Sequence, residues 1–145
     1  MGKLDNRVAL ITGAASGIGK AIAMKFAREG ANIAIVDIAK QPAEELEEEL
    51  RKNGCKTISI LCDVTNERQV VRAVKQAVKE LGGLHILVNN AGVSPLKPLA
   101  EITLDDWNRV LGINLTGPFL FTKFAFPYIK EAGSKGRVIN MGSLA

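Results

Sequence analysis

The sequence predicts an α/β domain, a doubly wound parallel β-sheet with helices on both faces. Short runs rich in β-branched residues alternate with helical patterns along the chain, which is typical of parallel sheets. The runs are almost continuously apolar, as expected for strands that are covered on both faces. Because crossovers between parallel strands are right-handed, the doubly wound arrangement is the natural topology. We expect its five strands in the order 3-2-1-4-5.

The expected strands are short apolar runs, most of which end at polar or turn-forming residues. They cover residues 7–12, 32–37, 56–62, 84–88 and 137–141. The sequence contains no internal repeat, no low-complexity segment and no linker. We therefore expect residues 1–145 to belong to a single domain.

The helices between the strands are indicated by their apolar spacing and by residues that favour helix ends. In the first helix, Ile18, Ile22 and Phe26 are spaced by four residues, which places them on one face. The second helix is charged and narrow-faced, and the fifth is expected at residues 115–131. The end signals are Gly30 after the first helix, Pro42 in the first turn of the second, Thr65 as the cap of the third, Gly82 after it, and a Thr103–Asp106 capping box before the fourth.

Composition and charge exclude several classes of protein. With 47% hydrophobic and 23% charged residues and a mean hydropathy of +0.12, the chain is not intrinsically disordered. No apolar run approaches the ~20 residues of a membrane span. The N-terminus also lacks the apolar stretch of a signal peptide. We therefore expect a cytoplasmic protein without a membrane partner.

Neither the charged residues nor the cysteine and histidine residues are arranged for nucleic-acid or metal binding. The net charge of +4 comes from scattered side chains, and the densest charge run, residues 44–49, is acidic, so we expect no nucleic-acid partner. Cys55, Cys62 and the single histidine, His85, lack the spacing of metal ligands. We therefore expect no metal site, two reduced thiols, and a structural role for His85.

A glycine-rich loop follows the first expected strand. Gly13, Gly17 and Gly19 are spaced as G-x-x-x-G-x-G at the junction between strand and helix. Small residues let a backbone approach a pyrophosphate, and the first helical N–H groups can bind it. This Rossmann-like pattern predicts a dinucleotide site that includes Ser16 and Ile18; the alternative is a glycine-rich turn without a ligand. A phosphate-binding loop of the Walker type is excluded, because Ala21 follows Gly19-Lys20.

An acidic residue ends the second strand. Asp37 lies 18 residues beyond Gly19 (37 − 19), where a carboxylate can accept hydrogen bonds from the adenosine ribose and repel a 2′-phosphate. Neither Ser16 nor Ile38 is a cation that could neutralise such a phosphate. The sequence therefore favours NAD over NADP, although Asp37 could also be a surface residue that begins a turn.

Polar residues also follow the third and fourth strands. Asp63 could accept a hydrogen bond from the adenine amino group, with Val64 packing beside it. The run Asn89 to Gly92 contains two asparagines, Asn89 and Asn90, which can satisfy loop backbone where the strand leaves the sheet. The carboxyl ends of parallel strands lie along one edge of the sheet, where ligands bind in doubly wound folds. We therefore expect Asp63, Val64, Asn90 and Gly92 to bind the cofactor.

These motifs together resemble the short-chain dehydrogenase/reductase family from about Leu4 to Ala145. The resemblance is carried by residues 12–19, Asp63, residues 89–92, Asn114 and residues 140–143. It implies hydride transfer between a nicotinamide cofactor and an alcohol or ketone. It also implies that Asn114 helps to hold a proton-relay water and that Ser143 hydrogen-bonds the substrate oxygen. The alternatives are a helix kink or cap for Asn114 and a post-strand turn for Ser143.

The chain departs from the family at its acid/base pair. The family uses a Tyr followed four residues later by a Lys, which lowers the pKa of the phenol. The single tyrosine, Tyr128, precedes Ser143, and Lys130 is only two residues beyond it. We therefore expect the pair to lie past Ala145, so that this chain is a cofactor-binding fragment lacking the C-terminal part of its domain, which binds NAD weakly at best and is inactive alone. The alternative is a non-catalytic dinucleotide-binding or sensing module; a methyltransferase is a more distant one.

The resemblance also bears on assembly. A domain that ends after its fifth strand leaves that strand at an open sheet edge. The apolar helix at residues 115–131 would lose a neighbour, which invites association. In the family this helix resembles part of a subunit interface, so we expect the complete protein to be a homo-oligomer.

Overall fold

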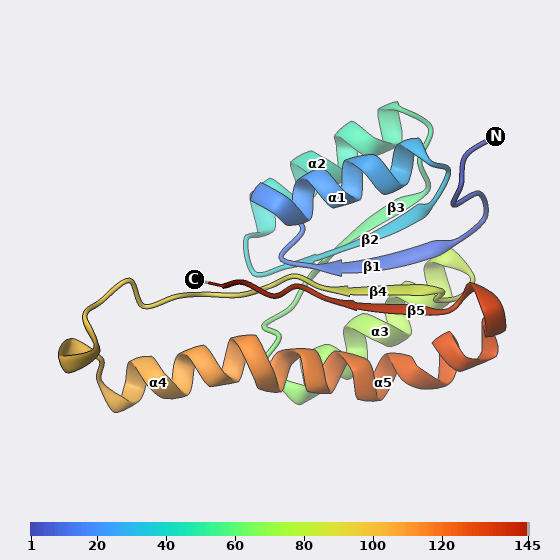
Figure 1. Ribbon diagram of the computed structural model, residues 1–145. Helices are drawn as coiled ribbons and strands as arrows, with labels where there is room; N and C mark the ends of the chain where they lie inside the picture. The colour runs from blue at the N-terminus through green and yellow to red at the C-terminus, as the bar shows by residue number, and fades with distance from the viewer. Residues whose placement is uncertain (145) are drawn as a thin grey trace.

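The computed structural model describes residues 1–144 and contains the predicted parallel sheet (Figure 1). Its five strands have the order β3-β2-β1-β4-β5, as predicted. The strands are β1 (Val8–Thr12), β2 (Asn32–Asp37), β3 (Thr57–Leu61), β4 (Ile86–Asn89) and β5 (Arg137–Asn140). Each observed strand lies within two residues of its predicted bounds.

Helices cover both faces of the sheet. They are α1 (Gly17–Arg28), α2 (Lys40–Lys52), α3 (Glu67–Leu81), α4 (Leu104–Leu111) and α5 (Gly117–Glu131), with short 3-10 turns η1 (Leu99–Glu101) and η3 (Gly133–Lys135). Helices α1 and α2 lie on one face, α3 and α5 lie on the other, and α4 extends past the carboxyl ends of the strands (Figure 1). Two apolar clusters result, one on each face, because the buried strands point alternate side chains into both layers.

Two details of the helices differ from the predictions. Thr65 does not cap α3; the Asn66 side chain does so by accepting a hydrogen bond from the Gln69 N–H at 3.1 Å. Thr65 instead donates its N–H and hydroxyl to Asp63 in a tight turn, which moves the helix start along by one residue. Helix α5 also does not begin separately at residue 115, because the π-helical segment η2 (Gly112–Thr116) joins it to α4 without a break.

The two edges of the sheet differ in whether side chains occupy their backbone groups. At the β3 edge, the Ser59 N–H donates to the Glu47 carboxylate at 2.9 Å. Arg51 and Arg72 donate to the carbonyls of Thr57 and Leu61 at 3.3 and 3.2 Å. These side chains occupy backbone groups that another strand could otherwise pair with. At the opposite edge, all four described residues of β5 are exposed.

His85 anchors the amino-terminal end of the sheet. Its Nδ1 accepts a hydrogen bond from the Val8 N–H at 3.0 Å, and its backbone N–H and carbonyl pair with Val8 and Arg137. Burial lowers the pKa of His85, and the charges of Lys135 and Arg7 lower it further. The imidazole is therefore held neutral as a hydrogen-bond acceptor, in keeping with a structural role.

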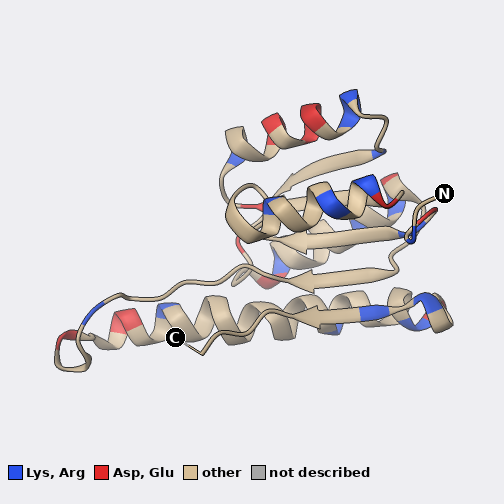
Figure 2. Ribbon diagram, turned by 45° about the horizontal axis from the view of Figure 1, so that its top comes forward, with Lys and Arg blue, Asp and Glu red and all other residues tan. Residues whose placement is uncertain are grey.

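Charged residues are spread over several elements of the described part of the chain (Figure 2). Figure 2 shows Lys and Arg on several helices and loops, and acidic residues along α2. Across residues 1–144, no helix has both the length and the apolar character needed to cross a bilayer.

Candidate functional site

Two hollows lie side by side at the carboxyl ends of the strands. The β1–β3 pocket, of about 790 Å³, is lined by the glycine loop and by residues that follow β2 and β3. The β4–β5 pocket, of about 1150 Å³, is lined by residues that follow β4 and β5 and by α5. They share Ile18 and residues 90–93, so they form one continuous groove. This is the edge where the sequence places its candidate site residues.

The glycine loop brings α1 close to the end of β1. A Cβ on Gly19 would lie 2.2 Å from the Gly13 carbonyl oxygen, a distance that only glycine permits. Gly13 and Gly17 have positive φ angles, +64° and +54°, which glycine adopts without strain. Ser16 precedes α1 in an extended conformation and its side chain caps no N–H group. The first turn of α1 can therefore present backbone N–H groups to an anion.

Asn90 and Thr12 fix this loop to β4. The Asn90 side-chain amide donates to the carbonyls of Thr12 and Gly13 at 3.0 and 3.2 Å. In return, the Thr12 hydroxyl accepts the N–H groups of Asn90 and Ala91, both at 3.0 Å. Asn90 therefore satisfies loop backbone, as expected from its place after the strand. The loop is held in shape before any ligand binds.

The two carboxylates of the β1–β3 pocket are oriented by backbone groups. Asp37 accepts the N–H groups of Ala15 and Ala39, both at 2.9 Å. Asp63 accepts the Thr65 N–H and hydroxyl at 2.9 and 2.7 Å. Each carboxylate retains further acceptor capacity toward the pocket, so both can receive ligand hydroxyl or amino groups.

Val64 and Cys62 form the apolar part of the same pocket. Val64 is buried, and a Cβ on Gly117 would lie 2.8 Å from its Cγ2, so α5 packs directly against it. Burial raises the pKa of the Cys62 thiol to about 11. Because only a thiolate is strongly nucleophilic, Cys62 lines the pocket as a neutral group.

Sequence reasoning did not identify two polar residues of this pocket. Asn108 and Arg109 of α4 line the β1–β3 pocket together with the predicted residues. Their sequence positions carry no signal for this, because only the packing of α4 beside the loop after β3 brings them there.

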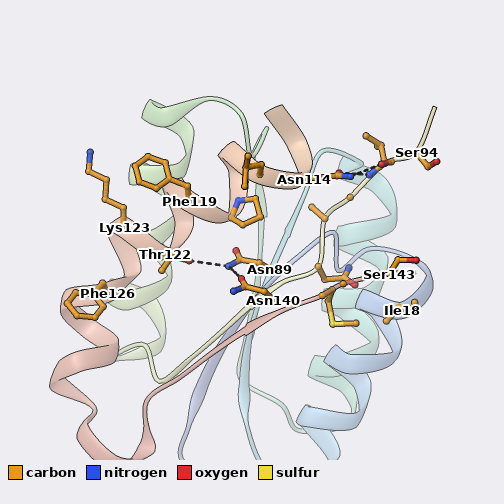
Figure 3. A pocket seen from close by; sticks show the side chains of 18 of the residues that line it. Ile18, Asn89, Ser94, Asn114, Phe119, Thr122, Lys123, Phe126, Asn140 and Ser143 are labelled. Carbon is orange, nitrogen blue, oxygen red and sulfur yellow. Dashed lines mark hydrogen bonds between the residues drawn. The ribbon is translucent and has the colours of Figure 1, made fainter. Parts of the chain in front are cut away.

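The β4–β5 pocket has a polar base in which Asn89 does not satisfy loop backbone as predicted, but bonds two side chains across the sheet edge (Figure 3). The Asn89 amide donates to Thr122 at 3.2 Å and to Asn140 at 2.8 Å, which joins β4, α5 and β5. The Asn89 side-chain oxygen is buried without a hydrogen-bond partner among the described residues. These contacts tie β5 and α5 to the end of β4.

The two predicted catalytic residues line the β4–β5 pocket together, as Figure 3 shows for Asn114 and Ser143. Asn114 lies within the π-helical segment, and its side chain clamps Val93 by accepting its N–H and donating to its carbonyl, both at 2.8 Å. Asn114 therefore has a local structural role, which is to hold the backbone of Val93. Its part in a proton relay, and the part of Ser143 in substrate binding, stay predictions.

Comparisons with known proteins agree with this arrangement. Residues 7–145 match the family described as short chain dehydrogenase. The chain is 43% identical over 143 residues to D-threitol dehydrogenase of Mycolicibacterium smegmatis, covering 99% of this chain and 55% of that protein. It is 41% identical over 141 residues to the uncharacterized oxidoreductase YxjF of Bacillus subtilis, covering 97% of this chain and 54% of that protein.

Solved structures show the same fold. A short chain dehydrogenase/reductase from Burkholderia phymatum in complex with NAD has a TM-score of 0.93 at 32% identity, covering 99% of this chain and 51% of that one. A blue fluorescent protein from a metagenomic library in complex with NADPH has a TM-score of 0.90 at 39% identity, covering 97% of this chain and 57% of that one. The chain thus spans about half the length of these relatives. By sequence and fold, it belongs to the short-chain dehydrogenase/reductase family.

Proposed function

We propose that the protein is an NAD-dependent oxidoreductase that transfers a hydride between nicotinamide and an alcohol or ketone. The observation that carries this proposal is the continuous groove along the strand ends. It contains the glycine loop, locked by Asn90, together with Asp37 at one end and Asn114 and Ser143 at the other.

Each predicted cofactor-binding residue has a place in this proposal. The N–H groups of the glycine loop would hold the pyrophosphate, Asp37 the adenosine ribose, and Asp63 with Val64 the adenine. Asn90 and Gly92, which line both pockets, would border the cofactor between its two halves. The bound nicotinamide supplies the hydride chemistry, and Ser143 would hydrogen-bond the substrate oxygen beside it.

The preference for NAD rests on Asp37. Its carboxylate is fixed by two backbone N–H groups at the mouth of the β1–β3 pocket, where a 2′-phosphate would meet a negative charge. Since the related structures contain NAD in one case and NADPH in the other, the choice depends on residues of this chain.

Calorimetric titration of NAD and NADP against the chain tests this preference. We expect tighter binding of NAD, and we expect Asp37→Asn to narrow the difference. Asp105→Asn is a matched control, because Asp105 is exposed in the first turn of α4. Tighter binding of NADP by the unsubstituted chain would overturn the assignment.

The proposed reaction also needs a proton donor. Tyr128 packs against the core on α5, and Lys130 is two residues beyond it rather than four. We propose that the family's Tyr/Lys pair belongs to the part of the protein that follows, and that this chain binds NAD without turnover. Sustained NADH formation by the chain alone, abolished by Ser143→Ala, would contradict this.

The complete coding sequence distinguishes the enzyme from its alternative. If the whole protein carries the Tyr/Lys pair and reduces ketones with NADH, it is an oxidoreductase. If it binds NAD tightly but transfers no hydride to any alcohol or ketone, a non-catalytic dinucleotide-binding module is the better description.

We also propose that the complete protein is a homo-oligomer. The continuous helix formed by α4, η2 and α5 carries a row of exposed apolar side chains. Outside both pockets, they are Leu104, Trp107 and Leu111. Such a row invites a partner helix, and light scattering of the complete protein tests it; a monodisperse monomer would refute the proposal.

A further inference from the structure

One glutamate of α2 differs from its neighbours in the acidic run of residues 44–49. The side chains of Glu44 and Glu48 are 56% and 68% exposed, and each pairs with a lysine four residues away on the same helix. The Glu47 side chain is only 15% exposed, because it lies against the edge strand β3. Glu47 therefore contacts the sheet instead of contributing to a solvated helix surface.

The strand that Glu47 contacts has a single neighbour in the sheet, which is β2. The Lys56 carbonyl and the Cys62 N–H pair with β2. Because a parallel strand directs the backbone groups of alternate residues to opposite sides, Thr57, Ser59 and Leu61 present their N–H and carbonyl groups to the open side. We call these three the outward residues of β3.

Side chains occupy one backbone group of each outward residue. The Glu47 carboxylate accepts the Ser59 N–H, at 2.9 Å, and the Ser59 hydroxyl. Arg51 and Arg72 donate to the carbonyls of the other two outward residues, at 3.3 and 3.2 Å. Arg51 also forms an ion pair with Glu47, so the two contacts from α2 support each other.

This arrangement opposes antiparallel pairing in particular. In an antiparallel ladder, each hydrogen-bonded residue uses both its N–H and its carbonyl toward one residue of the partner strand. Two copies related by a two-fold axis would pair their β3 edges in this way, because each copy must donate where the other accepts. Every outward residue has one of these two groups occupied, so none can complete such a pair.

One pair of backbone groups is left without a side-chain contact. The Ser59 carbonyl and the Leu61 N–H have no hydrogen-bond partner among the residues that the structure describes. Together they could hold one residue of a parallel strand, which is too short a contact for stable pairing. All the groups that close the edge lie within residues 47–72, and β5 is at the opposite edge of the sheet, so the closure does not depend on the exposure of β5 or α5.

We propose that Glu47 is an autoinhibitory contact that keeps the β3 edges of two copies of this chain from pairing. The opened edge fits a second β3 in antiparallel orientation, centred on Ser59. A hollow of about 390 Å³, lined by Ser59, Leu61 and side chains of α2 and α3, lies along this edge and gives an incoming strand room. The closure stands whether or not the protein transfers hydride, because it does not involve Asn114 or Ser143.

Sedimentation velocity of the protein made from its complete coding sequence tests the proposal with Glu47→Ala. The substitution frees the Ser59 N–H, so that two N–H···O bonds become possible between the Ser59 residues of two copies. We expect species heavier than the unsubstituted assembly to appear at a protein concentration lower on the order of thirty-fold. Glu47→Gln keeps an acceptor oxygen, and the matched control Glu48→Ala removes an equal charge from the same helix; both should behave like the unsubstituted protein.

The double variant Glu47→Ala with Ser59→Pro locates the contact. Ser59→Pro removes the N–H on the open side of an edge strand, where proline is tolerated, and leaves the bonds to β2 in place. The double variant should return to the assembly of the unsubstituted protein. Equal association of the double variant and Glu47→Ala would place the contact elsewhere and overturn the proposal. Equal association of Glu47→Ala and Glu48→Ala would do the same, because charge alone would then explain the effect.

Arg72→Met opens the edge a second time and leaves α2 unchanged. It frees the Leu61 carbonyl, so that both backbone groups of Leu61 become available for an antiparallel pair. Arg72 is exposed on α3, and Lys75→Met is the matched control on the same helix. We expect Arg72→Met to increase association to the same order as Glu47→Ala, and it decides the question alone if Glu47→Ala does not fold. If neither variant associates more than its control, the proposal fails.

Hydrogen exchange at the Ser59 amide reports on the contact directly. In the unsubstituted protein Glu47 holds this amide, so its exchange rate should not depend on protein concentration. In Glu47→Ala it should exchange on the order of ten-fold more slowly at concentrations where the heavier species form than in dilute protein. A rate that is independent of concentration in Glu47→Ala would show that β3 does not pair, and would overturn the proposal.

Discussion

The hydroxyl of Thr12 should contribute more to the stability of this protein than a buried hydroxyl usually does. Thr12 is 2% exposed and accepts two backbone N–H groups, those of Asn90 and Ala91, at 3.0 Å each. Thr12→Val keeps the shape of the side chain but removes the acceptor. Both N–H groups then lose their partner at the point where the glycine loop meets β4.

The expected magnitude follows from these two bonds. An N–H group left without a partner costs about 1–3 kcal/mol when it is fully buried. Both groups are only partly buried, so water compensates in part and we expect a loss of about 2 kcal/mol. For a chain of this length, that corresponds to a melting temperature lowered by roughly 4–8 °C.

Thr57→Val provides the matched comparison. Thr57 is equally buried, but its hydroxyl donates a single bond, to the Ile33 carbonyl at 2.8 Å. Removing a donor to one carbonyl should cost about 1 kcal/mol or less. Urea unfolding followed by circular dichroism gives both values, and calorimetry should show weaker NAD binding for Thr12→Val alone. If Thr12→Val is no less stable than Thr57→Val, the hydroxyl of Thr12 does not hold the glycine loop against β4.

Three further predictions concern other parts of the fold. Gly19→Ala should lower stability by about 1–3 kcal/mol and weaken NAD binding, because its methyl group meets Gly13, whereas Gly142→Ala should be neutral in urea unfolding since its Cβ site is open. Because the pKa of His85 is lowered on folding, the unfolded state binds more protons, so the free energy of unfolding should fall as the pH drops below about 6.5. Unfolding curves measured over a pH series test this. If the free energy of unfolding of His85→Asn falls with pH as much as that of the unsubstituted chain, the prediction is refuted. Phe121→Ala should cost about 3–5 kcal/mol because Phe121 is fully buried, and a calorimetric melt within 2 °C or so of the unsubstituted chain would contradict it.

Local patterns were sufficient for the framework of the fold. Continuous apolar runs predict strands that are buried on both faces, and the spacing of Ile18, Ile22 and Phe26 predicts a helix. The predicted helix cap was wrong where two neighbouring residues could both cap the helix. At the start of α3, Thr65 hydrogen-bonds Asp63, so that Asn66 is the cap. Both residues are plausible caps in sequence, and only the turn before the helix decides between them.

For the site, the sequence by itself determined which residues lie along the groove after each strand. Gly13, Asp63 and Asn90 follow β1, β3 and β4, and Asp37 ends β2; the carboxyl ends of parallel strands must meet at one edge. Only the tertiary structure decided what holds and completes the groove. Arg109 lines the β1–β3 pocket, Asn89 joins Thr122 and Asn140, and Lys97 reaches Asp106. These contacts depend on how the helices are placed against the sheet, because a side chain's sequence position sets its element but not its neighbours across the fold.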